Sequence, residues 1–138
     1  MKKGFTLIEL LIVLAVISAL LSVATPVALR SVAKAKATQV AMNLRNVNSA
    51  LEQALLLYPD EFNPTALSGK NILFELYNKG FINVDLSTKG YQVVYDDKDK
   101  KYLIKYTNND IDPILVKSAY PAVKQNDDGD LYVEVSLQ

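Results

Sequence analysis

The sequence predicts an α+β fold in which one long N-terminal helix packs on a small antiparallel sheet. Residues 5–24 form an apolar run in which Glu9 is the only charged side chain. Apolar residues then recur at spacings of four and three as far as Tyr58, which is the period of a helix. Short alternating runs separated by polar turns follow from Tyr91 onward, and these are typical of strands.

The apolar run has the length of a membrane span. About 20 residues make a helix of roughly 30 Å, which matches the hydrocarbon thickness of a bilayer. Lys2 and Lys3 precede the run, and basic residues tend to remain inside, so we expect a cytoplasmic N-terminus. The hydroxyls of Ser18 and Ser22 can bond a carbonyl one turn back. Pro26 removes a helical hydrogen bond, so a kink is expected there.

The carboxylate of Glu9 must either reach the water at the membrane interface or pair with another group. A charged side chain in a membrane helix costs on the order of 3 kcal/mol on insertion scales, although Glu9 is near enough to the cytoplasmic end to reach the interface. Gly4 is small and flexible, which makes Gly4–Phe5 an accessible peptide bond. Cleavage there would place a new amine on Phe5 in the same apolar layer as Glu9. In a bundle, the amine of one subunit can meet the carboxylate of its neighbour and fix the axial register.

Residues 4–13 read GFTLIELLIV. This run resembles the cleavage and methylation signature of type IV prepilins and of the related pseudopilins of type II secretion, and the resemblance covers residues 2–26. It implies removal of residues 1–4 by a prepilin peptidase, N-methylation of Phe5, and assembly of the mature chain into a helical filament. Phe5, Glu9 and Pro26 would make the assembly contacts. The helix near Pro26 can unwind in filaments of this family.

The resemblance also implies partners and a location. The precursor would span the inner (cytoplasmic) membrane once, with its N-terminus inside, and would meet an assembly platform there. The product would be a homo-oligomer in an extracellular pilus or a periplasmic pseudopilus. Three roles stay open: a pilus subunit for adhesion, motility or DNA uptake, a pseudopilin, and a minor pilin with a ligand-binding role. The main alternative is signal-peptidase cleavage after Ala24, which leaves Glu9 unexplained.

Residues 27–58 continue the helix as an amphipathic segment. A stripe this rich in alanine is typical of packing against a sheet or neighbouring helices. Pro59 ends the helix, because the residue before a proline is disfavoured in helical conformation. The stripe consists of Ala33, Ala37, Val40, Leu44, Val47, Leu51, Ala54 and Tyr58.

Residues 59–138 are expected to form a globular head. A connecting loop at 60–90 contains a short helix, and a second short helix opens with Asp112 and Pro113. About three strands packed on an amphipathic helix suffice for a small core. We expect helices at 71–78 and 114–120 and strands at 91–95, 101–106 and 131–135.

The composition argues against catalysis, cofactors and a disulfide. The chain has no cysteine and no histidine, which removes the commonest general base, the thiolate nucleophile and the usual zinc ligands. Residues 59–138 carry nine basic against thirteen acidic side chains, so nucleic-acid binding is not expected. We expect no metal. The alternative is calcium at Asp127, Asp128 and Asp130, since major pseudopilins bind that ion in a C-terminal loop, but the spacing does not match an EF-hand.

Overall fold

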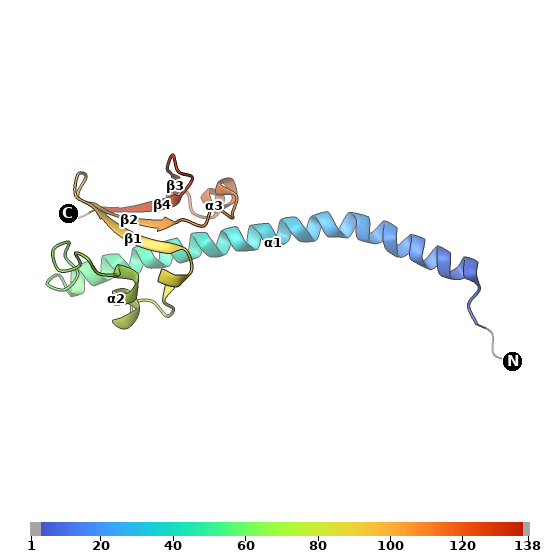
Figure 1. Ribbon diagram of the computed structural model, residues 1–138, viewed down its shortest axis with the longest axis horizontal. Coiled ribbons are helices and arrows are strands. Elements are labelled where there is room, and N and C mark those ends of the chain that lie inside the picture. Colours follow the sequence, from blue (N-terminus) through green and yellow to red (C-terminus); the bar gives the residue numbers. More distant parts are fainter. Residues whose placement is uncertain (1–3, 137–138) are drawn as a thin grey trace. The chain divides into compact units, whose positions relative to one another are not determined.

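A computed structural model describes residues 4–136 of the chain. Lys2 and Lys3, on which the expected orientation depends, lie outside the described residues. The chain divides into two compact units, Met1–Ala35 and Lys36–Gln138, and helix α1 (Leu7–Leu57) is continuous through both. The fold is α+β, with this long helix packed on a four-stranded antiparallel sheet (Figure 1).

The first unit consists of the apolar part of α1 and the residues before it. Every side chain from residue 4 to residue 36 is exposed. The helix continues through Pro26. Ser18 Oγ donates to the Leu14 carbonyl at 2.8 Å and Ser22 Oγ donates to the Ala19 carbonyl at 2.7 Å. These bonds satisfy two polar side chains without any partner outside the helix, as the sequence predicts.

The second half of α1 provides one wall of the core in the second unit. The predicted stripe is buried from Ala37 to Ala54, and Ala41 and Ala50 are buried beside it. Ala33 is exposed because it precedes the first core residue of α1. Tyr58 is also exposed, at 43%, because it lies beyond the end of the helix.

The connecting loop contains α2 (Ile72–Asn78), which corresponds to the helix predicted at 71–78. It also contains a short 3-10 helix, η1 (Leu86–Thr88), which was not predicted. Asn71 caps α2 by accepting a hydrogen bond from the Phe74 amide at 3.2 Å. Gly80 has φ +83° and lies at the point where the chain leaves the helix, as expected of a glycine that ends a helix.

The sheet has the order β1-β2-β4-β3 and is antiparallel throughout. The predicted strands appear as β1 (Tyr91–Asp96), β2 (Lys101–Tyr106) and β4 (Leu131–Ser136). A fourth strand, β3 (Lys124–Gln125), was not predicted. It is too short to show alternation in sequence and exists because the following turn folds it back on β4.

The sheet presents one apolar face to the core. On β2 the face formed by Tyr102, Ile104 and Tyr106 is buried, and Leu131, Val133 and Val135 form the equivalent face of β4. Helix α3 (Pro113–Ala119) begins after Asp112, which accepts a hydrogen bond from the Ile114 amide at 2.9 Å.

Two asparagines of α1 fix the helix to the rest of the head. Asn43 Nδ2 donates to the Tyr91 hydroxyl at 3.0 Å, and Asn48 Nδ2 donates to the Tyr120 hydroxyl at 2.9 Å. These side chains connect α1 to β1 and to the end of α3.

Candidate processing and assembly site

The predicted cleavage site lies in exposed, non-helical backbone. Gly4, Phe5 and Thr6 precede the first residue of α1, and the Phe5 side chain is 86% exposed. A Cβ placed on Gly4 would have no neighbour within 4 Å. A peptidase can therefore approach the Gly4–Phe5 bond without first unwinding a helix, and among residues 4–136 none lies close enough to require a small residue at position 4.

Glu9 makes a pair of reciprocal hydrogen bonds with Thr6. The Thr6 amide donates to Glu9 Oε2 at 2.9 Å, and the Glu9 amide donates to Thr6 Oγ1 at 3.2 Å. This arrangement is a capping box, which satisfies two backbone donors at the start of a helix. This capping box was not predicted, although a threonine followed three residues later by a glutamate is its usual sequence signature.

The capping box gives the Glu9 carboxylate a polar partner within its own chain. A negative charge is also favoured at the positive end of a helix dipole. Glu9 Oε1 has no hydrogen-bond partner among residues 4–136. One carboxylate oxygen therefore caps the helix while the other is free to accept a second donor.

The intersubunit pair expected from the sequence requires a charge that the uncleaved chain lacks. The nitrogen of Phe5 belongs to the Gly4–Phe5 peptide bond and carries no charge before cleavage. The capping box instead explains how the carboxylate is held before assembly. The assembly role of Phe5, Glu9 and Pro26 stays a prediction.

Helix α1 is long enough and apolar enough in the first unit to cross a membrane. The most apolar window of α1 has a mean hydropathy of 2.7 and no buried residue. Among the described residues α1 alone passes this test, which a signal sequence near an N-terminus would also pass. The exposed large apolar side chains of the first unit extend from Phe5 to Val32.

The acidic turn at residues 126–130 is closed by its own hydrogen bonds. The Asp130 amide donates to Asn126 Oδ1 at 2.8 Å, and the Gly129 amide donates to the Asn126 carbonyl at 3.1 Å. Gly129 has φ +89°, a conformation that favours glycine. Within residues 4–136 no three Asp, Glu, His or Cys side chains are grouped to hold a metal ion. The expectation of no metal, and its alternative of calcium at Asp127, Asp128 and Asp130, both stay predictions.

Comparison with known proteins agrees with the geometry at the N-terminus. Residues 1–25 match the family model of the prokaryotic N-terminal methylation motif, which is the signature of type IV pilins and pseudopilins. The resemblance inferred from residues 4–13 is thereby confirmed. The motif supports a type IV pilin-like or pseudopilin-type substrate of prepilin peptidase, and together with the long apolar helix it supports a membrane-anchored precursor. Searches of curated proteins and of solved structures found no match.

Proposed function

We propose that this chain is a structural subunit of a type IV pilus-like extracellular filament that serves adhesion, motility or DNA uptake. The observation that carries the proposal is the methylation motif at residues 1–25. The absence of His and Cys from the sequence favours a structural role over a catalytic one.

The exposed apolar helix supports this proposal. Full burial of one large aliphatic or aromatic side chain is worth about 1.5–3 kcal/mol, and the first unit exposes many of them along a single helix. Such a surface is stable only when lipid or other helices cover it. A bilayer would cover it in the precursor, and copies of the same helix would cover it in a filament.

Assembly would begin with cleavage between Gly4 and Phe5 and methylation of the new Phe5 amine. The amine of one subunit would then meet the Glu9 carboxylate of its neighbour, and Pro26 would allow the helix to adapt as subunits pack. The partners are prepilin peptidase, an assembly platform in the inner membrane, and further copies of the chain.

The test is the protein content of sheared surface filaments. We expect a major species whose N-terminus, by mass spectrometry, is N-methylated Phe5. A mature chain that starts at Thr25 would indicate signal-peptidase processing and would contradict the proposal. Normal processing without surface filaments, together with a secretion defect on deletion, would identify a pseudopilin instead.

Variants of Gly4 provide a matched control for processing. Gly4→Ala should be cleaved, whereas Gly4→Leu should accumulate uncleaved, because the peptidase requires a small residue. The space around Gly4 is open, so neither change disturbs the fold of this chain.

A further inference from the structure

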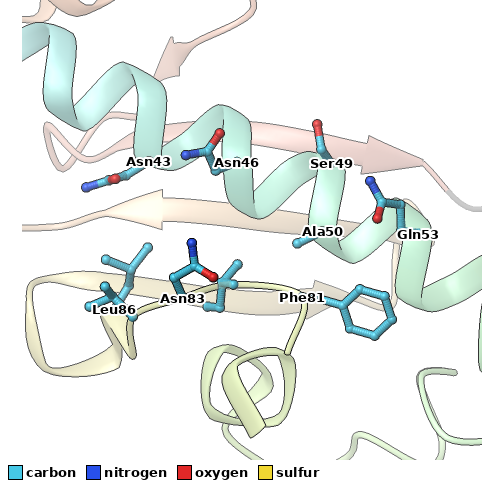
Figure 2. A pocket seen from close by; sticks show the side chains of 10 residues that line it. Asn43, Asn46, Ser49, Ala50, Gln53, Phe81, Asn83 and Leu86 are labelled. Atoms are coloured by element: carbon cyan, nitrogen blue, oxygen red, sulfur yellow. The ribbon is translucent and has the colours of Figure 1, made fainter. Parts of the chain in front are cut away.

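A cavity of about 490 Å³ that is open to solvent lies between the second half of α1 and the segment 81–86, entirely within the second unit (Figure 2). Neither the processing site nor the apolar part of α1 in the first unit contributes a residue to its lining. Its volume falls in the range of small-molecule sites, about 300–1,000 Å³.

Neutral amide and hydroxyl groups line the cavity. Residues on successive turns of α1 form one wall, and Asn83 projects from the facing segment. The α1 wall consists of Asn43, Asn46, Ser49, Ala50 and Gln53.

Most of these groups have no hydrogen-bond partner within the protein. Asn43 Nδ2 donates to the Tyr91 hydroxyl, but the amides of Asn46, Gln53 and Asn83 have no partner among the residues that the structure describes. These three side chains are exposed, so water satisfies them when the site is empty. Each free amide offers both donors and an acceptor. The cavity therefore presents several uncommitted neutral polar groups to one volume.

The remaining lining is apolar. Ala50, Ile82 and Leu86 are buried, and Phe81 and Val84 complete the apolar contribution. The lining residues include no charged side chain. A ligand would thus meet polar groups and an apolar surface together.

This lining selects among ligand classes. A charged ligand would lose its hydration without gaining a counter-charge. A purely apolar ligand would bury the free amides without partners, at about 1–3 kcal/mol for each group. A neutral ligand that carries many hydroxyl groups and has an apolar face satisfies both parts of the lining.

The usual modes of peptide recognition do not fit. Strand addition needs a free sheet edge, whereas the lining residues belong to a helix and a loop. Proline-rich recognition needs a groove lined with aromatic rings, and Phe81 is the single aromatic side chain in the lining. Capture of phosphorylated residues relies on charged groups, and capture of chain termini relies on backbone nests. The lining of this cavity has no charged side chain.

We propose that this cavity binds a neutral carbohydrate of one or two sugar units. The sugar hydroxyls pair with the amides of Asn46, Gln53 and Asn83, and the C–H face of the ring rests on the apolar lining. This binding is separate from the proposed filament role and does not depend on assembly.

The test uses full-length protein in a detergent whose headgroup is not a sugar, because a glycoside detergent would compete for the site. The probes are neutral methyl hexosides, methyl N-acetylhexosaminides and their disaccharides, measured by saturation-transfer NMR and titration calorimetry. At least one should bind saturably. The Asn46→Ala/Asn83→Ala double variant should weaken binding by about tenfold or more, because two hydrogen-bonding side chains are lost. Gln39→Ala, an exposed amide on the same helix outside the cavity, should leave affinity unchanged.

Several results would overturn the proposal. These are the absence of saturable binding by every probe, equal affinity in the double variant, and binding of anionic sugars alone. If the double variant loses filament assembly while no sugar binds, the cavity is a contact between copies of the chain. If the double variant melts abnormally, Val84→Trp, which fills the cavity from an exposed position, should abolish binding in its place. Because binding is measured without filaments, failed assembly leaves this result unaffected.

Discussion

Glu9 can serve two purposes that are separable by mutation. In the single chain its Oε2 accepts the Thr6 amide and completes a capping box. In the proposed filament its charge would neutralise the Phe5 amine of a neighbouring subunit. The first purpose needs a hydrogen-bond acceptor, whereas the second needs a negative charge.

Glu9→Leu should leave membrane insertion intact or improved, because a costly charge is removed. Filament yield should fall to about a tenth or less, because orphaning one member of a buried ion pair costs several kcal/mol. Glu9→Gln keeps an acceptor for Thr6 but lacks the charge, so it should fail in assembly as well. Thr6→Val removes one capping bond only and should assemble nearly as wild type. Membrane fractionation and filament yield give the two measurements.

Two results would contradict the role assigned to Glu9. Normal filaments built from Glu9→Leu subunits alone would show that the carboxylate is dispensable. Normal filaments from Glu9→Gln together with failure of Thr6→Val would show that helix capping matters and that the charge does not.

At the scale of the elements, strand β2 carries two buried tyrosines with different hydroxyl environments. The Tyr106 hydroxyl donates to Asp110 Oδ1 at 2.6 Å, whereas the Tyr102 hydroxyl is buried without a partner among the described residues. Burial raises the pKa of Tyr102 to about 12. The pKa of Tyr106 is also raised to about 12, with burial as the largest cause and the hydrogen bond to Asp110 as the next.

Tyr102→Phe should leave the free energy of unfolding unchanged or raise it by about 1 kcal/mol, because a buried hydroxyl without a partner is removed. Tyr106→Phe should lower it by about 1 kcal/mol, because a hydrogen bond to a carboxylate is lost. Urea melts of a fragment that starts at Val27 measure both changes at neutral pH. A marked loss of stability in Tyr102→Phe would show that its hydroxyl has a partner, such as an ordered water.

The same tyrosines predict alkaline destabilisation of the head. Their folded pKa of about 12 lies above the ordinary value of 10.0, so the unfolded chain loses its protons first as the pH rises. Stability is therefore fully present below about pH 10 and is lost as the pH rises through about 12. Urea melts from pH 9 to pH 12 should show this decline, and Tyr102→Phe should make it shallower. An equal decline in the variant would contradict the assignment to Tyr102.

At the scale of the whole molecule, the second unit is built around one apolar core without a disulfide. The chain has no cysteine, and the buried residues of the described chain form a single apolar cluster from Ala37 to Val135. The acidic turn closes through backbone and Asn126 contacts. Folding of the head should therefore require neither a disulfide nor a metal.

The melting temperature of the Val27–Gln138 fragment should be the same with calcium and with a chelator. Asp127→Asn and Asp130→Asn should also leave it unchanged, because neither carboxylate supports the turn through a side-chain bond that the structure shows. Thermal melts followed by circular dichroism make the comparison. A large loss of stability on chelation would favour the pseudopilin alternative, with Asp127, Asp128 and Asp130 as calcium ligands.

The sequence by itself determined the features that depend on local pattern. Periodicity predicted α1 to within two residues at its N-terminal end and one at its C-terminal end, and alternation predicted strand β2 with its observed bounds. The signature at residues 4–13 identified the type of N-terminus, since a peptidase reads a linear segment. The Thr6–Glu9 capping box is just as local, and the spacing of these two residues would have been enough to predict it.

Only the tertiary structure decided the features that depend on residues distant in sequence. Strand β3 exists because a turn returns it to β4, and two residues are too few for a periodic signal. Ala41 and Ala50 are buried because the head covers a wider face of α1 than the stripe indicates. The cavity combines α1 with a loop about 30 residues further along the chain, and no pattern within either segment shows that their amides face one volume.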